Sequence, residues 1–349
     1  MKIYKNLFAE IISSDNLFAS WTEFRRGKGR KEDVAAFEFE LEQNIFKLQR
    51  ELTDKTYCHG AYTSFYINDP KRRHIHKATV PDRVLHHAIF RILNPIYDQI
   101  LIPDSFSCRL DKGTHRGVNA AERMIRTESR NYIRLCYILK CDVKQFFASV
   151  DHQILLMILK KKIKDTDTFC LLEKVIKSFP GGQDNLFSQR GLPIGNLTSQ
   201  LFANIYLNEL DQFVKRELKI KHYARYTDDF IIISQDKLFL EEIIPLIKEF
   251  LKAKLKLEIH PNKISISPYH RGLDFLGYIT LPHYRLLRKR TKRRICRKLR
   301  ERVSEFKTGA ISEEDLNRSL QSFLGVLSHA NAHKLTQDLK NKFWFWLKE

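Results

Sequence analysis

The sequence predicts a mixed α and β protein, either α+β or α/β, that ends in a helical lobe. Three patterns indicate this class. Apolar residues recur at helical spacing over residues 1–55. Helix-like and strand-like segments then alternate as far as residue 283, and the basic tail from Arg285 returns to helical spacing.

Composition narrows the class of partner. The chain has 349 residues, enough for one large domain or for two to three lobes with a sizeable core. Its 61 Lys and Arg exceed its 41 Asp and Glu, which gives a formal net charge of +20. An excess of this size suits a polyanion such as nucleic acid. A basic but otherwise ordinary surface is the alternative.

Cysteine usage and hydropathy indicate the compartment. The six cysteines form no C-x-x-C pair and have no regular spacing, so we expect reduced, mostly buried thiols. No signal peptide precedes the body, and no apolar run reaches the roughly 18 residues that span a bilayer. We therefore expect a cytoplasmic protein with no membrane partner.

The first half of the chain contains a pair of strands between helices. Residues 62–67 and 74–80 alternate in polarity like strands on either side of the turn at Asn68-Asp69-Pro70. From Arg83 to Leu93 the apolar spacing is helical again.

The second half alternates in the same way. A β-rich run at 135–143 precedes a helix that extends through the lysines at 160–164, and residues 201–218 form a strongly periodic helix. The other expected elements are a hairpin at 223–234, a helix at 243–255 and strands at 257–266 and 273–279.

The expected hairpin carries two adjacent carboxylates at its tip. Asp228 and Asp229 follow Tyr226 between two strand-like runs. Carboxylates beside a buried apolar strand are costly unless a cation pairs with them, and a divalent metal ion is the usual solution. For these residues alone, an ordinary Asp-rich turn is the alternative.

A third carboxylate stands at the end of the strand expected at 135–143. Asp142 precedes an expected helix, so taken alone it could be a helix N-cap. Set against a hairpin that bears two more acids, it can instead form one anionic pocket for two divalent cations about 3.5–4 Å apart. Such ions activate an attacking 3′-hydroxyl and stabilise a leaving pyrophosphate.

Seven motifs in a fixed order make nearly the whole chain resemble the reverse transcriptase family. Residues 73–87 resemble the finger motif that ends in Asp-Arg-Val, and residues 104–115 resemble the second motif. Residues 142–147 resemble the first catalytic palm motif, and residues 226–229 resemble the Tyr-x-Asp-Asp box. Residues 191–200 resemble the Gly-containing fourth motif, and residues 260–263 and 273–278 resemble the last two motifs.

This resemblance implies an α+β right-hand polymerase fold, with fingers, a palm built on an antiparallel sheet, and a helical thumb. The implied divisions are an N-terminal helical extension at 1–55, fingers at 56–134 with part of 152–190, a palm at 135–151 and 191–283, and a basic helical thumb at 284–349.

The resemblance also assigns roles to residues. Asp142 and Asp228 would be the principal ligands of two Mg²⁺ ions, for which Mn²⁺ could substitute, and Asp229 would complete the acidic cluster. Phe147 would lie against the incoming sugar and exclude a 2′-hydroxyl. The other residues implied at the nucleotide are Arg73 and Lys71 at the triphosphate, Ile194, Gly195 and Gln200 of the fourth motif, and Lys263 near the pyrophosphate. For Arg73, Lys71 and Lys263, an ordinary surface charge is the alternative.

The fourth motif departs from the general pattern of the family. Most reverse transcriptases carry Gln before its Gly and Ser-Pro after it, whereas this chain has Ile194 and Ser199-Gln200. That variant resembles the reverse transcriptases of diversity-generating retroelements, which copy a template-repeat RNA and misincorporate opposite adenine. An apolar Ile194 cannot hydrogen-bond near the template base as Gln can, so we expect it to lower fidelity. Simple packing is the alternative role for this residue.

The C-terminal tail is dense in positive charge. Eleven Lys or Arg occur among the nineteen residues 285–303, and on a helix Leu286, Ile295, Leu299 and Val303 would pack while the charges line another face. We expect this surface to bind the template–primer duplex, with a merely solvated face as the alternative. The arginines expected at nucleic acid are Arg109 of the second motif and Arg288, Arg290, Arg293, Arg294 and Arg297 of the tail.

These observations predict an RNA-directed DNA polymerase that uses an RNA template, a DNA or RNA primer and dNTPs. The resemblance to diversity-generating enzymes adds a small accessory protein and a structured RNA as expected partners. The nearest alternative is an antiphage defence reverse transcriptase that makes a defensive cDNA. An intron-type enzyme is disfavoured because the fourth motif departs and a maturase extension is lacking. An inactive RNA-binding protein is disfavoured because all three acids are present.

Overall fold

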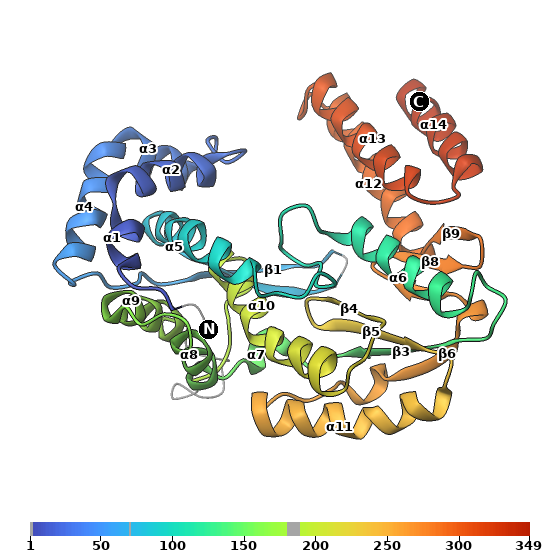
Figure 1. The fold of residues 1–349 in the computed structure, drawn as a ribbon. Coiled ribbons are helices and arrows are strands. Elements are labelled where there is room, and N and C mark those ends of the chain that lie inside the picture. The colour runs from blue at the N-terminus through green and yellow to red at the C-terminus, as the bar shows by residue number, and fades with distance from the viewer. Residues whose placement is uncertain (1–2, 70, 180–188) are drawn as a thin grey trace.

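A four-stranded antiparallel sheet with the order β4-β5-β3-β6 lies at the centre of the fold (Figure 1). The structure is a computed structural model that describes residues 3–69, 71–179 and 189–349. Pro70 of the expected turn and residues 180–188 of the expected finger segment lie outside the described residues. The strands of the sheet are β3 (Tyr137–Asp142), β4 (Tyr223–Tyr226), β5 (Asp229–Ser234) and β6 (Ser265–Pro268).

Apolar side chains alternate between the two faces of this sheet because successive residues of a strand point to opposite sides. Leu139 and Ile232 join the large core on the face that α11 (Lys237–Leu255) covers. Ile138 and Ile231 join a smaller core beneath α6 (Thr114–Glu128) on the opposite face. Helix α6, expected among the fingers, therefore packs on the central sheet.

Helices precede the sheet, as expected for residues 1–55. They pack against the long helix α5 (Val80–Asp98), α2 most extensively (Figure 1). The Ser13 hydroxyl caps α2 by accepting a hydrogen bond from the Asn16 backbone N–H. These helices are α1 (Leu7–Ile12), α2 (Ser14–Arg25), α3 (Glu32–Phe39) and α4 (Leu41–Thr53).

The expected strand pair is present as β1 (Thr63–Ile67) and β2 (Arg73–Lys77), which run antiparallel. The second strand ends at Lys77, earlier than the expected residue 80. The reason is that Thr79 caps α5, accepting a hydrogen bond from the Asp82 backbone N–H, so Val80 is already helical.

The single helix expected after β3 is divided into α7 (Phe146–Ser149) and α8 (His152–Lys160). Asp151 causes the break because its carboxylate accepts a hydrogen bond from the Ile154 backbone N–H and starts a new helix. Helix α9 (Thr166–Lys177) follows. The long periodic helix is α10 (Leu197–Gln212), which continues as a π-helix over Phe213–Glu217.

Three expectations of secondary structure need correction. Residues 257–264 do not form a strand, since β6 begins at Ser265 after a 3₁₀ turn. The run at 273–279 is a hairpin of β7 (Leu273–Phe275) and β8 (Tyr278–Leu281), because Leu276 and Gly277 adopt positive φ values of 53° and 91°. Residues 284–287, expected to be helical, form strand β9 (Tyr284–Leu287), which pairs with β8.

The C-terminal helices lie together (Figure 1), and they pack around a core of their own. Ile295, Leu299 and Val303 are buried in it, as predicted from their helical spacing. Leu286 instead lies on β9 and is 40% exposed. The helices are α12 (Lys289–Lys307), α13 (Glu313–Ser328) and α14 (His333–Lys348).

The cysteines correct another expectation. All six are free, but most of them are not buried. Cys136 and Cys141 are buried and Cys296 is half-buried, whereas Cys58, Cys108 and Cys170 are exposed.

Within the described ranges, none of the helices combines the length and the apolar character needed to cross a membrane. The antiparallel sheets and the helices around them confirm the α+β right-hand fold.

Candidate active site

The structure brings together the three acids that the sequence singled out. Asp142 ends β3 and lies directly opposite Asp229, the first residue of β5. The Val143 backbone N–H donates to the Asp228 carbonyl oxygen at 3.1 Å, which fixes the tip of the hairpin beside the end of β3. By strand alternation, Asp142 and Asp229 share the sheet face of Ile138 and Ile231. Asp142 is therefore a strand-end residue and not a helix N-cap.

The carboxylates of Asp142, Asp228 and Asp229 lie close together in a partly buried site, so they repel one another. Burial, followed by the charge of Asp142, raises the pKa of Asp228 from 3.8 to about 6. Burial also raises the pKa of Asp229, and the neighbouring Asp142 acts in the same direction while Lys140 opposes it. Burial and mutual repulsion therefore both disfavour the ionised forms of Asp228 and Asp229.

Lys263 is the cation closest to this cluster. Its Nζ lies 2.6 Å from Asp142 Oδ1. The 3₁₀ turn that carries it is tied to the end of β3, because the His260 backbone N–H donates to the Asp142 carbonyl oxygen at 2.8 Å. The expected proximity of the motif at 260–263 to the catalytic motif is thus present, and the Lys263 side chain is 41% exposed.

The donor set fits divalent cations. Asp142, Asp228 and Asp229 offer carboxylate oxygens, the hard ligands that Mg²⁺ and Mn²⁺ prefer. In the part of the chain that the structure describes, no group of three or more His, Cys, Asp or Glu side chains is arranged so that it could hold a metal ion. The Lys263 ammonium group pairs with Asp142 Oδ1. The raised pKa values of Asp228 and Asp229 indicate a pocket that positive charge would stabilise.

A buried ion pair that the sequence analysis missed supports the hairpin. Arg225 of β4 and Asp211 of α10 are both fully buried, with Nε–Oδ1 at 2.7 Å and Nη2–Oδ2 at 2.6 Å. Arg225 Nη1 also donates to the Thr227 carbonyl oxygen at 3.0 Å, within the turn of the hairpin. The Tyr223 hydroxyl donates to Asp211 at 2.7 Å. The signal in the sequence was an Arg inside an otherwise apolar strand.

The tip of the hairpin is also held from the second motif. Thr227 adopts a positive φ of 54°, which is unfavourable for a β-branched residue. Its hydroxyl shares a hydrogen bond of 2.7 Å with Ser107 Oγ. The Asn204 amide of α10 donates to the Ser107 carbonyl oxygen at 2.8 Å. These contacts offset the cost of a strained residue immediately before the two acids.

Phe147 lies on α7, shortly after Asp142. Its ring is half-buried and contacts Phe146 edge-on, with 5.4 Å between ring centroids. The Leu192 backbone N–H donates to the Phe147 carbonyl oxygen at 2.6 Å, so the fourth motif is attached to the helix that carries this ring.

The fourth motif also contacts the finger strand β2. The His76 backbone N–H donates to the Ile194 carbonyl oxygen at 3.0 Å. Gly195 has a φ of 116°, and a Cβ there would lie 2.9 Å from Ile75 Cγ2, so a side chain at this position would be strained and crowded. Ile194 is half-buried, and the expected nucleotide-binding side chains of Arg73, Lys71 and Gln200 are exposed.

Arg109 needs a different interpretation from the expected contact with nucleic acid. Its side chain is 7% exposed and pairs with Asp98 at 2.6 Å. It also donates to the carbonyl oxygens of Ile102, Ser105 and Asp98. These bonds use four of the five guanidinium N–H groups, so Arg109 holds its own loop together and has little capacity left for phosphate.

The basic residues of the tail differ in their exposure and in whether they pair with an acidic side chain. Arg288 pairs with Asp274 of β7. Arg297 lies 3.0 Å from Glu301 and 3.5 Å from Asp69, a residue of the turn after β1. Arg293 and Arg290 are exposed and Arg294 is half-buried. Arg293 thus presents its charge to solvent as expected, whereas Arg288 and Arg297 already have acidic partners.

The raised pKa of Asp228 predicts a pH-dependent gain in stability for Asp228→Asn without metal ions. The folded protein binds this proton up to about pH 6 and the unfolded chain only up to 3.8. Ionisation of Asp228 therefore costs stability as pH rises between these values, and the cost is complete above pH 6. We expect Asp228→Asn to raise the free energy of unfolding by about 2 kcal/mol at pH 7, after discounting for partial exposure, with the gain disappearing towards pH 4.

Urea unfolding in EDTA at several pH values measures this gain. Asp338→Asn is the matched control, since Asp338 is exposed on helix α14, outside the central sheet. An Asp228→Asn protein no more stable than the wild type at pH 7, or one whose gain is the same at every pH, contradicts this electrostatic interpretation.

Most of the chain is similar to one known protein family. The family described as "Reverse transcriptase (RNA-dependent DNA polymerase)" matches residues 68–280, which include all three acids. The group II intron-encoded protein LtrA of Lactococcus lactis subsp. cremoris is 25% identical over 79% of this chain and 57% of its own length. Protein YkfC of Escherichia coli (strain K12) is 26% identical over 60% of this chain and 62% of its own.

A third relative matches a comparable share of this chain. The retron Ec73 reverse transcriptase of Escherichia coli is 26% identical over 64% of this chain and 70% of its own length. The chain spans little more than half of LtrA and less than two thirds of YkfC. Since the matched region covers well over half of the chain and contains the site built from β3 and the β4–β5 hairpin, the chain belongs to the reverse transcriptase family.

Proposed function

We propose that this chain is an RNA-directed DNA polymerase that extends a DNA or RNA primer on an RNA template with dNTPs. The observation that carries the proposal is the meeting of Asp142, Asp228 and Asp229 at the sheet end, within the region that matches the family. When bound by these carboxylates, Mg²⁺ or Mn²⁺ would supply the positive charge that activates a 3′-hydroxyl and offsets the charge of the leaving pyrophosphate.

The chain's own residues would orient the reactants. The Lys263 ammonium group lies 2.6 Å from Asp142, and it can exchange this carboxylate for a phosphate oxygen as its ion-pair partner. Phe147, half-buried on α7, would exclude a 2′-hydroxyl from the sugar site by its bulk. The exposed Arg73 on β2 has a guanidinium group suited to the triphosphate. The basic helix α12 would bind the template–primer duplex.

We further propose that synthesis is error-prone at template adenines, as in diversity-generating retroelements. The support is the fourth motif, in which Ile194 stands where most of the family has Gln and is held by its carbonyl against β2. An apolar side chain offers no hydrogen bond to test the geometry of the new base pair. A small accessory protein and a structured RNA belong to this proposal as partners.

A second candidate is cDNA synthesis in the manner of a retron or an antiphage defence system. The observation in its favour is the match to the retron Ec73 reverse transcriptase, which extends over 70% of that protein. A retron-type enzyme predicts synthesis restricted to its own RNA, whereas the diversity-generating type predicts errors concentrated at adenine.

We expect purified protein to extend a primed RNA of mixed sequence only when Mg²⁺ or Mn²⁺ is present. Asp228→Ala should lower the extension rate by more than about a thousandfold, because it removes charge stabilisation made in the transition state. Primer extension on a gel measures the rate, and template–primer affinity without nucleotides serves as the control for folding. Full activity of Asp228→Ala, or extension in EDTA, contradicts the proposal.

We expect Ile194→Gln to reduce misincorporation opposite template adenine relative to the other three bases, because the amide restores a hydrogen-bonding group. Sequencing of cDNA from wild type and variant on the same RNA measures the error spectrum. Ile194→Leu is the matched control, since it keeps an apolar side chain of similar volume. An error spectrum that Ile194→Gln leaves unchanged would show that Ile194 only packs.

A further inference from the structure

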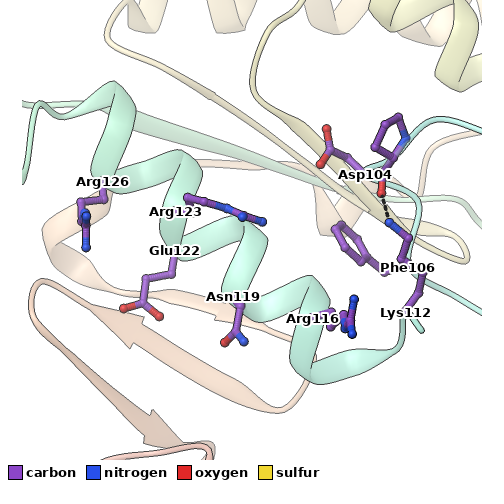
Figure 2. A pocket seen from close by; sticks show the side chains of 9 residues that line it. Asp104, Phe106, Lys112, Arg116, Asn119, Glu122, Arg123 and Arg126 are labelled. Carbon is purple, nitrogen blue, oxygen red and sulfur yellow. Dashed lines mark hydrogen bonds between the residues drawn. The ribbon is translucent and has the colours of Figure 1, made fainter.

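A cavity of about 620 Å³ lies between α6 and the segment that precedes it (Figure 2). The helix lines one wall, and Figure 2 shows the side chains that it contributes. The residues at the cavity are Pro103, Asp104, Phe106 and Lys112 from the preceding segment, and Arg116, Asn119, Glu122, Arg123 and Arg126 from α6.

Three arginines on this face of α6 have no acidic partner. Arg116, Arg123 and Arg126 are all exposed, and in the described ranges of the chain none of them forms an ion pair or a side-chain hydrogen bond. The helical spacing of seven and then three residues places them along one side of α6. Like charges so arranged repel one another unless an anion lies between them.

The acids beside these arginines are already neutralised by other cations. Glu122 pairs with Arg285 of β9. Asp104 lies 3.5 Å from Lys215 Nζ. Lys112 adds a further positive charge next to the cavity, with its Nζ 2.8 Å from the Pro103 carbonyl oxygen. The face therefore carries surplus positive charge that the protein itself does not balance.

The length of the row indicates a polymeric anion. The eleven residues from Arg116 to Arg126 span about 15 Å along a helix. One strand of double-stranded DNA carries a phosphate about every 3.4 Å along the helix axis, and an RNA strand likewise carries one phosphate per nucleotide. The row thus matches several successive phosphates and exceeds the size of one phosphate group.

The three arginines lie outside the sequence segments that carry the catalytic carboxylates Asp142, Asp228 and Asp229. The segment that lines the cavity runs beside β4, the edge strand of the central sheet, with hydrogen bonds of 3.0 Å from Arg225 N–H to Asp104 and from Phe106 N–H to Arg225. Asp142 lies on the inner strand β3, whereas Asp228 and Asp229 follow β4 in the hairpin. The arginines also lie on the solvent side of α6, opposite Ala121 and Ile125, which pack on the sheet.

We propose that the α6 face formed by Arg116, Arg123 and Arg126 binds the phosphate backbone of RNA outside the catalytic cleft. This inference rests on the proposed polymerase function, because its ligand is a part of the template RNA that is not being copied. Such a contact would add affinity for a long structured RNA without changing how the primer end is held.

The test uses the whole chain and two kinds of probe. One is a short blunt RNA template–DNA primer duplex, and the other is the same duplex with a structured RNA attached to the 5′ or the 3′ end of the template. We expect Arg116→Gln, Arg123→Gln and Arg126→Gln combined to weaken binding of at least one extended probe about tenfold. The slope of log affinity against log salt should fall by about 2 to 3. Affinity for the short duplex should change less than about twofold.

The matched control removes three charges from the other side of the sheet. Lys248, Lys252 and Lys254 are exposed on α11, so their combined substitution by Gln changes the net charge equally. We expect this control to lower the affinity for the extended probes far less than the arginine variant does. An equal loss in both triple variants would reduce the effect to net charge and overturn the proposal.

Two further outcomes overturn it as well. Unchanged affinity of the arginine variant for every extended probe excludes RNA as the ligand, and an acidic protein would then be the partner to seek. An equal loss for the short duplex would place α6 on the cleft's own substrate. Because affinities are measured without nucleotides, failure of primer extension by the wild type would reject the polymerase proposal separately.

Discussion

The ion pair between Arg225 and Asp211 is the constraint on which the catalytic hairpin depends. Both residues are fully buried, and two short bonds join the guanidinium group to the carboxylate. A buried charge is tolerated only when a partner and further hydrogen bonds satisfy it, and here the Tyr223 hydroxyl and the Thr227 carbonyl oxygen complete the network. The pair therefore ties strand β4 to helix α10 and fixes the turn immediately before the two adjacent acids.

The hairpin held in this way places the carboxylates where their ionised forms are unfavourable in the free protein. The register of β3 and β5 sets Asp142 opposite Asp229, and burial together with mutual repulsion raises the pKa values of Asp228 and Asp229. Lys263 offsets part of this charge. The remaining negative charge is available to cations, which can also contact the phosphates of a substrate. The stability that the free protein loses by holding these carboxylates together therefore contributes to its affinity for those ligands.

The sequence predicted the elements whose periodicity is strong and missed contacts between distant residues. The hairpin at 223–234 and the position of Asp142 at a strand end followed from local patterns. Strand β9 was expected to be helical because dense Lys and Arg after it obscured four residues of alternation, of which Arg285 is buried against Glu122. The partner of Arg225 could not be predicted, since nothing local shows that Asp211, fourteen residues away, is buried beside it.

Denaturant unfolding of Asp211→Asn at pH 7 tests the central claim most directly. Removing one member of a buried ion pair leaves an uncompensated charge, so the free energy of unfolding should fall by about 3–5 kcal/mol. Tyr223→Phe, which removes one hydrogen bond to the same carboxylate, should cost only about 1 kcal/mol. A loss of less than about 1 kcal/mol for Asp211→Asn would mean that the hairpin is held by other contacts and would contradict the account.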